Sequence, residues 1–514
     1  MRRRYTLILS LLVIILWSSC RKDFEYTPSS GNLSFSKDTV FLDTIFTNIG
    51  SSTYALTVYN KTGFDMEIPS VRLGQGQQSN YRLNVDGIPG KEFQGIPLRA
   101  RDSLFIFIET TVDIDQVNGP TFLYTDAIQF DSGFNLQEVA LVTLVKDAIF
   151  LYPPSDSNGQ KETLNLGIDG NGDEIRVEGF TLGNDQLNFT NEKPYVIYGY
   201  ASVPENATLT MEAGTRVYFH QNSGLWVRPT ASLHINGELS TDSLLLEKEV
   251  IFEGDRLEPR FDNIAGQWGT IWMAKGSTDN RIDHLTLKNA TVGVLVEGDG
   301  TLAAPTLSIR NTQVYNSASV NLWAKSAWIE AENVVLGSAG NTSLYCNLGG
   351  KYAFVHATLA NFWSRGLRGG AALQIDNETR FPSGEVVSAD LTEARFVNSI
   401  IDGNGMLELQ LISNQTNTFN FSFTNCLIKI DEQATAISGN ALYDFEDPSR
   451  YAQVLLNASA RFIDTGENVF RLGADSPAIG TAQEAAALLV PFDILGIDRT
   501  LVPDMGAYQY IPVD

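Results

Sequence analysis

Two arginines in a glycine-rich stretch are the side chains best suited to hold an anionic sugar. Arg365 and Arg368 lie in the segment WSRGLRGG, directly after Trp363. A guanidinium can donate paired hydrogen bonds to a carboxylate, and a neighbouring ring offers a flat apolar face. The same glycines also suit a bend between two strands. Ligand binding and a structural bend both remain open for this segment, and the bend is the simpler interpretation.

Tryptophan is the other residue type that could contact a sugar. Alternation places Trp226 between Leu225 and Val227, so the indole is expected to point outward, and the same argument applies to Trp328. Stacked aromatic residues also fill the interiors of β-structures. Both are therefore weak candidates for ligand contact. Six tryptophans share this part of the chain: Trp226, Trp268, Trp272, Trp323, Trp328 and Trp363.

No catalytic set stands out, and the catalytic residues are left as unknown. Glycoside hydrolysis needs two carboxylates roughly 5 to 10 Å apart, which spacing alone does not identify here. The chain contains no HxxxH, CxxC or GxSxG string. Residues 167–174 begin like an EF-hand loop, but Glu174 stands where that loop needs glycine and Phe180 where it needs a bidentate glutamate. We therefore expect no metal and no cofactor.

A repeat indicates the elements that must position these side chains. The segments LKNATV, IRNTQV and AENVVL place asparagines 22 residues apart, and the slot recurs in FVHATL, FVNSII and FTNCLI. Apolar and polar residues alternate within each unit, which is typical of half-buried strands. We predict an all-β chain with a right-handed parallel β-helix of ten or eleven coils. The expected structural ladder consists of Asn289, Asn311, Asn333, His356, Asn398 and Asn425.

Residues that precede these ladder positions carry charge. Lys288 and Arg310 each stand directly before an asparagine, and Glu332 takes the same place in the next unit. If the units stack in register, the three side chains would form an outer strip of alternating sign. The simplest interpretation of such a strip is a solvated face.

The first twenty residues predict where in the cell the protein is located. Three arginines, Arg2 to Arg4, precede an apolar run from Leu7 to Trp17, which is followed by Ser18, Ser19 and Cys20. The run is too short to span a bilayer and is typical of a signal peptide. Its end resembles the lipobox of bacterial lipoproteins, which implies lipidation of Cys20 and anchoring to a membrane. We expect a signal peptide at 1–19 and a lipidated tether at 20–32.

Composition and turn spacing divide the remainder. The 514 residues carry a formal net charge of −24, which disfavours nucleic acid as a partner. Short alternating strands separated by turns predict an immunoglobulin-like β-sandwich at 33–147. We place a linker and N-terminal cap at 148–192 and the β-helix at 193–430. The last coils and a C-terminal cap, with a helical turn at 481–489 over the open end, complete the chain at 431–514.

Several strings resemble one group of proteins. RKDFE after Cys20, the strand order of the sandwich, AGQWGTIWM, and DSPAIG with PDMGAYQY near the end are similar to strings in surface lipoproteins of Bacteroidetes, with an immunoglobulin-like module and a pectate-lyase-like β-helix. The resemblance implies an outer-membrane lipoprotein that faces the cell exterior. It indicates a fold and a location, not an activity. Membrane anchoring and the absence of a catalytic set favour binding of a polysaccharide, or of an envelope or host protein, without catalysis.

The alternative is a polysaccharide lyase or glycoside hydrolase. Ile282, Asp283 and His284 form a tripeptide similar to one in pectate lyases, although Arg281 replaces the tryptophan of that string. Alternation explains Asp283 and His284 as ordinary polar positions. We therefore favour the non-catalytic role.

Overall fold

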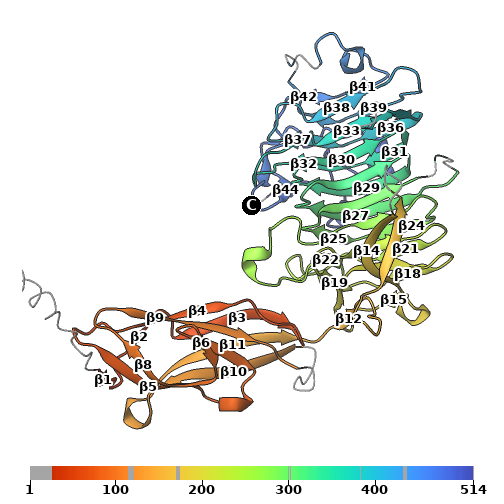
Figure 1. Ribbon diagram of the computed structural model, residues 1–514. Coiled ribbons are helices and arrows are strands. Elements are labelled where there is room, and N and C mark those ends of the chain that lie inside the picture. Colours follow the sequence, from red (N-terminus) through yellow and green to blue (C-terminus); the bar gives the residue numbers. More distant parts are fainter. Residues whose placement is uncertain are drawn as a thin grey trace, which may run out of the picture. The chain divides into compact units, whose positions relative to one another are not determined.

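The computed structural model describes residues 26–113, 121–168, 174–298, 300, 303–381, 384–431, 434 and 437–512, which form two compact units (Figure 1). One unit ends at Asp147 and the other begins at Ala148. Regular structure in the described ranges is almost entirely β-strand, which confirms the expected all-β class. No helix in these ranges is long and apolar enough to cross a membrane. The predicted signal peptide and Cys20 lie outside the described residues.

The first unit is a β-sandwich of two sheets. In β9 (Ser103–Thr110), Leu104, Ile106 and Ile108 are buried between the sheets, whereas Phe105 and Phe107 are exposed. This alternation follows from the period of two along a strand. The immunoglobulin type of the sandwich stays a prediction. One sheet has the order β1 (Thr27–Pro28), β5 (Met66–Leu73), β10 (Thr121–Phe130), β11 (Gln137–Lys146) and β3 (Thr39–Phe46), with β8 (Glu92–Leu98) on β5; the other has the order β2 (Ser34–Phe35), β4 (Tyr54–Tyr59), β9, β6 (Tyr81–Val85) and β7 (Ile88–Gly90).

The second unit is a parallel β-helix with three faces, which we call A, B and C. Each coil runs through the faces in that order, and each strand pairs in parallel with the strand one coil away. Ten successive coils in the described ranges contribute a strand to face A, within the number expected. Face A contains β15 (Asn188–Phe189), β18 (Thr208–Met211), β21 (Ser232–Asn236), β24 (Asn280–Asp283), the first parts of β27 (Leu307–Tyr315) and β29 (Trp328–Gly337), β31 (Gly350–Val355), β36 (Leu391–Val397), β39 (Ser422–Thr424) and β41 (Tyr451–Ala452).

Faces B and C complete each coil. Face B contains β12 (Ile149–Leu151), β16 (Tyr195–Ile197), β19 (Arg216–Phe219), β22 (Val250–Gly254), β25 (Leu285–Lys288), the last parts of β27 and β29, β32 (Thr358–Asn361), β37 (Ile400–Gly403), β40 (Leu427–Ile428) and β42 (Leu455–Leu456). Face C contains β14 (Glu174–Thr181), β17 (Tyr200–Val203), β20 (Gly224–Val227), β23 (Ile271–Met273), β26 (Val292–Glu297), β28 (Val320–Lys325), β30 (Thr342–Asn347), β33 (Leu373–Asp376) and β38 (Leu409–Ile412). A further strand, β13 (Thr163–Ile168), pairs antiparallel with β14 and forms a hairpin with it.

The interior is filled by columns of stacked apolar side chains. Phe354, Phe396, Phe423 and Tyr451 occupy one register position on face A, with successive ring centroids 5.2, 5.2 and 5.7 Å apart. These distances are slightly larger than the parallel-strand spacing of about 4.8 Å. Parallel stacking of successive coils therefore forms the core without long-range chain crossings.

The corner between faces A and B carries the predicted ladder. A single residue in the left-handed conformation turns the chain there, with φ between 46° and 56° in seven consecutive coils. Asparagine tolerates this conformation better than other residues with a Cβ. The register places these residues at the corner: His284, Asn311, Asn333, His356, Asn398, Asn425 and Gln453.

The placement of Asn289 in this ladder was wrong. Lys288 pairs with Tyr315, so Asn289 stands beside Asn316 at the end of face B, one corner later. His284 occupies the position assigned to Asn289. Coils differ in length, so the interval of 22 residues between Asn289 and Asn311 joins two different corners.

The predicted strip of Lys288, Arg310 and Glu332 forms only in part, because Lys288 lies on a different face from the other two residues. Arg310 lies beside Glu332 in the next coil, with Nε 3.2 Å from the carboxylate, as expected for alternating charges. Lys288 does not stack on Arg310, because it ends a face B strand. Its Nζ lies 2.7 Å from Glu253 instead.

The C-terminal segment does not cover the open end of the β-helix, contrary to expectation. Residues 460–512, which we call the C-terminal strap, run back along face B and the A/B corner (Figure 1), and the backbone N–H of Ala507 donates a hydrogen bond to Thr358 in β32 (2.9 Å). Gln483, directly before α2 (Glu484–Leu489), accepts a hydrogen bond from Asn398 through its carbonyl oxygen (3.0 Å) and donates one to Asn398 Oδ1 (2.6 Å). Asn333 and Asn425 likewise donate side-chain hydrogen bonds to carbonyl oxygens of the strap, so the strap supplies partners for three of the corner amides.

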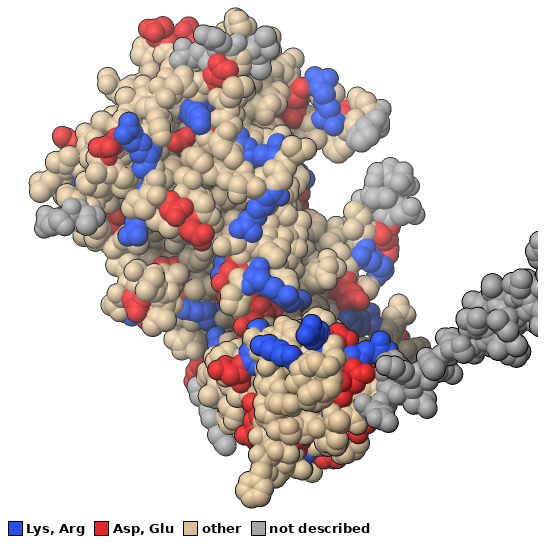
Figure 2. Space-filling model, turned by 90° about the vertical axis from the view of Figure 1, so that its left-hand side faces the viewer, with Lys and Arg blue, Asp and Glu red and all other residues tan. Residues whose placement is uncertain are grey.

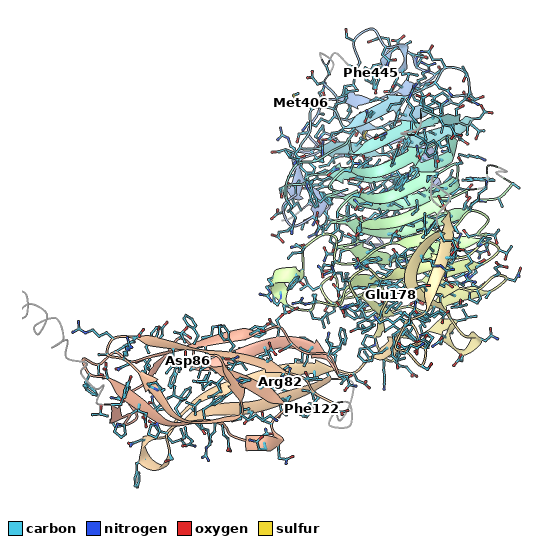
Figure 3. The ribbon with its side chains drawn as sticks, viewed as in Figure 1. Arg82, Asp86, Phe122, Glu178, Met406 and Phe445 are labelled. Atoms are coloured by element: carbon cyan, nitrogen blue, oxygen red, sulfur yellow. The ribbon has the colours of Figure 1, made fainter. Side chains whose placement is uncertain are left out.

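A different segment covers the last coil. Phe445, labelled in Figure 3, packs on Tyr451 with ring centroids 4.7 Å apart. The hydroxyl of Tyr443 accepts a hydrogen bond from the backbone N–H of Leu411 (2.7 Å). These aromatic side chains close the apolar interior where an open stack would expose it.

Candidate functional site

A cleft of about 730 Å³ lies along the corner between faces B and C, over the first coils of the β-helix. One side of the cleft is the base of the β13–β14 hairpin, and the other is formed by the turns that enter face C. The lining residues are Lys161, Val177, Glu178, Tyr198, Gly199, Tyr200, His220, Gln221, Asn222, Gly269, Thr270, Thr291 and Val292.

Tyr200 forms the floor of this cleft. A Cβ added to Gly224 would lie 2.6 Å from the Tyr200 ring, and one added to Gly269 would lie 2.2 Å from the Tyr200 hydroxyl. The ring therefore crosses two successive coils and lies directly on their glycine backbone. Burial raises the pKa of Tyr200, so the phenol stays neutral. The Tyr200 ring is therefore a fixed aromatic surface, and it can take this orientation only because residues 224 and 269 are glycines.

One wall of the cleft is a stacked pair of rings. Tyr198 and His220 lie with centroids 4.4 Å apart, and His220 Nδ1 is 2.7 Å from the carboxylate of Asp255. The Asp255 side chain is 8% exposed, whereas that of His220 is 46% exposed. Burial, and then the charge of Asp255, raises the pKa of Tyr198 to about 12. A buried carboxylate thus holds the imidazole in one orientation, and the imidazole supports the tyrosine.

The opposite wall carries a charge pair. Lys161 Nζ lies 2.9 Å from Glu178 Oε2, and both side chains are about half exposed. Glu178 lies on the hairpin beside the first coils (Figure 3). Each charge in the cleft wall therefore has a partner within the protein. The cleft therefore combines aromatic surfaces with oriented hydrogen-bonding groups, and the charges of its walls are balanced by neighbouring side chains.

A second feature of face C adjoins the cleft. One outward register position is occupied by large apolar side chains in five consecutive coils, and we call it the aromatic column. Each member lies between inward-facing residues, and each is partly exposed. The column consists of Trp226, Trp272, Leu295, Trp323 and Tyr345.

Contacts within face C hold the column in place. The ring centroids of Trp226 and Trp272 are 6.0 Å apart, and those of Trp323 and Tyr345 are 5.7 Å apart. The indole N–H of Trp272 donates a hydrogen bond to Glu297 (2.9 Å), and Glu297 forms an ion pair with Lys325 (2.7 Å). The aromatic side chains are thus ordered before any ligand binds.

Trp226 and Trp328, the two tryptophans predicted from the sequence to point outward, lie on different faces of the β-helix. Trp226 points outward on face C and belongs to the aromatic column. Trp328 also points outward, but on face A, where the ammonium group of Lys351 lies 3.7 Å from its ring centroid. Alternation along a strand fixes which side chains point out, whereas the coil decides which face they share.

Within the WSRGLRGG segment, Arg368 binds to other residues of the protein rather than pointing into solvent. The guanidinium of Arg368 lies 2.8 Å from Glu408, whose side chain is fully buried, and it also donates a hydrogen bond to the carbonyl oxygen of Asn361 (2.6 Å). Burial raises the pKa of Glu408, and the charge of Arg368 partly opposes this shift. Arg368 is therefore committed to the protein interior. Arg365 is exposed, and Trp363 lies against Gly340.

The remaining candidates form no site. His284 Nδ1 lies 2.7 Å from Asp283, whose carboxylate accepts a hydrogen bond from Asn311 (3.0 Å), so the tripeptide belongs to the ladder. Residues 169–173 of the EF-hand-like segment lie outside the described residues. Among the described residues, no three His, Cys, Asp or Glu side chains converge as metal ligands would. Cys346 and Cys426 are buried, and burial raises the pKa of both thiols.

Sequence reasoning did not find the cleft. His220 and Asp255 are 35 residues apart, and no spacing rule connects them. The aromatic column left a faint signal, because an apolar residue precedes the outward aromatic in Leu225–Trp226, Ile271–Trp272, Leu322–Trp323 and Leu344–Tyr345. Alignment of these pairs by coil would have placed them on one face.

No family model matches the sequence. No curated protein matches it either. Among solved structures, the chain is similar to an α-1,3-glucanase of family GH87 from Streptomyces thermodiastaticus, with 10% identity over 72% of this chain and 79% of that chain and a TM-score of 0.24.

Two further similarities are shorter. A family 123 glycoside hydrolase from Clostridium perfringens matches at 8% identity over 24% of this chain and 31% of its own length, with a TM-score of 0.16. A PapD-like domain of human CEP192 matches at 10% identity over 25% of this chain and 94% of its own length, with a TM-score of 0.15. At these TM-scores, none of the similarities bears on function.

Proposed function

We propose that the chain is a lipid-anchored envelope protein whose β-helix binds an uncharged glycan in the cleft between faces B and C. The observation that supports binding is the Tyr200 ring, which lies flat on Gly224 and Gly269 in a cleft with oriented polar walls. Sugar rings have apolar faces and hydroxyl edges, so they suit a flat aromatic floor flanked by fixed donors and acceptors.

Charge supports an uncharged ligand. The polar groups of the cleft walls are paired within the protein: Lys161 forms an ion pair with Glu178, and His220 contacts the carboxylate of Asp255. On the face shown in Figure 2, basic and acidic side chains are interspersed and most of the surface is uncharged. With a net charge of −24, the protein would repel a polyanion at long range. A uronate-rich polymer is therefore the less suitable ligand.

A binding role accounts for the cleft better than hydrolysis does. Hydrolysis of a glycosidic bond needs one carboxyl group that donates a proton and a second that acts as base or nucleophile. Glu178 is the one carboxylate among the described residues that line the cleft, and it lies 2.9 Å from Lys161. The second carboxyl group that hydrolysis requires is not among those lining residues.

The proposal is tested by binding of the whole chain to a panel of soluble neutral and uronate polysaccharides in isothermal titration calorimetry. Tyr200→Ala should abolish binding of the neutral ligand. Tyr152→Ala removes a tyrosine that is 64% exposed and outside the cleft lining, and should leave binding unchanged. Equal binding by both variants would overturn the proposal. Release of reducing or unsaturated ends would support the enzymatic alternative instead.

A further inference from the structure

The aromatic column continues the cleft along face C. Thr270 lines the cleft and stands two positions before Trp272 of the column, and Val292 lines it three positions before Leu295 in β26. At about 3.3 Å per residue, the two features are separated by roughly 7 to 10 Å. A ligand in the cleft can therefore reach the column without leaving face C.

The column has the dimensions of an extended ligand. Its five members lie in consecutive coils, so they cover about 19 Å along the axis of the β-helix at the parallel-strand spacing. A compact ligand would fill the cleft alone. A line of partly exposed rings on a rigid sheet instead matches a chain that runs along the axis and repeats the same contact.

Two charges of opposite sign beside the column are paired with each other. Glu297 and Lys325 occupy adjacent positions of the next outward register and form an ion pair of 2.7 Å. The guanidinium of Arg228 lies 5.0 Å from the Trp226 ring centroid. The column thus presents apolar surface with a polar border and no single-sign field, as the cleft does.

We propose that the aromatic column is an extension of the cleft that binds an internal stretch of a long, unbranched, uncharged polysaccharide along the axis of the β-helix. This inference rests on the proposed function of the cleft. It adds the size and shape of the ligand: the protein prefers polymers to short oligosaccharides. A protein partner on the column is the competing interpretation.

The test is a length series. The whole chain is titrated with neutral gluco-, manno-, galacto- and xylo-oligosaccharides, from the disaccharide to the decasaccharide. Affinity should rise with length in the series that binds. Trp323→Ala should lower affinity for the longest oligomers about three- to tenfold, because a lost aromatic contact is worth roughly 0.7 to 1.4 kcal/mol. Binding of the shortest oligomers should not change.

Trp328→Ala is the matched control, because it removes an outward, partly exposed tryptophan from face A. Tyr345→Ala tests the column a second time, in case Trp323→Ala disturbs folding. If Tyr200→Ala abolishes binding while both column variants behave like Trp328→Ala at every length, the column is not part of the glycan site. That result would leave the protein-partner interpretation. If no series binds, both the proposed function and this inference are overturned.

Discussion

The side-chain amide of Asn398 donates a hydrogen bond to Nε2 of His356 in the preceding coil, at 3.0 Å. The orientation of the amide is set, because Asn398 Oδ1 accepts from the backbone N–H of Gln483. Nε2 must therefore be an acceptor, and Nδ1, 3.3 Å from the carbonyl oxygen of Gly506, carries the proton. His356 is neutral in the folded protein. An imidazole thus replaces an amide in the ladder while it links the coil to the C-terminal strap.

The first prediction concerns stability at acidic pH. Burial, and then the charge of Arg499, holds the pKa of His356 well below its usual value of 6.5. The unfolded chain therefore takes up a proton that the folded protein does not. The contribution is fully present above pH 6.5 and is lost below it, by about 1.4 kcal/mol per pH unit. His356→Asn, the residue that most rungs use, should have a flatter stability profile between pH 6.5 and 5 in urea unfolding. Identical profiles would show that His356 is not held neutral.

The second prediction concerns the strap. Arg499 is 1% exposed and donates hydrogen bonds to Asn333 Oδ1 (2.9 Å) and to the carbonyl oxygen of Gly506 (3.2 Å). Arg499→Met should cost about 3 to 5 kcal/mol, because it leaves buried acceptors and nearby carboxylates without their cation. Proteolysis within residues 460–512 should also become faster. Arg471→Met removes an exposed arginine of the same segment and should do neither.

The third prediction separates the two arginines of the WSRGLRGG segment. Arg368→Met leaves the carboxylate of Glu408 buried without its partner, so we expect a loss of about 3 to 5 kcal/mol in the free energy of unfolding. Addition of Glu408→Gln should recover part of that loss. Arg365→Met should change stability by less than about 0.5 kcal/mol, as exposed substitutions usually do. If Arg368→Met is stable but loses glycan binding, Arg368 is a ligand contact after all.

The fourth prediction concerns the floor of the cleft. Gly269→Ala adds a Cβ 2.2 Å from the Tyr200 hydroxyl and 2.8 Å from the carbonyl oxygen of Ser223, so the ring must move. We expect a loss of about 1 to 3 kcal/mol in stability and a marked loss of glycan affinity. Gly63→Ala adds a Cβ with no atom within 4 Å and is the control. Unchanged titration curves for Gly269→Ala would show that the ring position does not matter.

The fifth prediction concerns the anchor. If Cys20 is lipidated, an alkyne-tagged fatty acid fed to the producing bacterium should label the wild-type protein. Cys20→Ser should abolish the label and release the protein from the membrane fraction. Cys346→Ser changes a buried thiol and should leave the label in place. Labelling of Cys20→Ser at the wild-type level would exclude this anchor.

The local features of the β-helix could be predicted from the amino-acid sequence alone. Alternation predicted half-buried strands, and the asparagines marked sharp turns, because both depend only on neighbouring residues. Asn311, Asn333, Asn398 and Asn425 all adopt the left-handed conformation at one corner. The number of coils followed from the same pattern.

Which residues share a face or a corner depends on how the coils stack. The corner residues lie 27, 22, 23, 42, 27 and 28 residues apart from His284 to Gln453, so a constant interval assigned Asn289 to the wrong corner. The stack also determines where the strap lies, because the strap bonds to amides along one corner. Likewise, the ion pair with buried Glu408 forms only when the coils bring Arg368 and Glu408 together. The cleft required coils to bring Tyr198, His220 and Asp255 together. Loop lengths set the register between coils, and that register is a property of the stack rather than of any local segment.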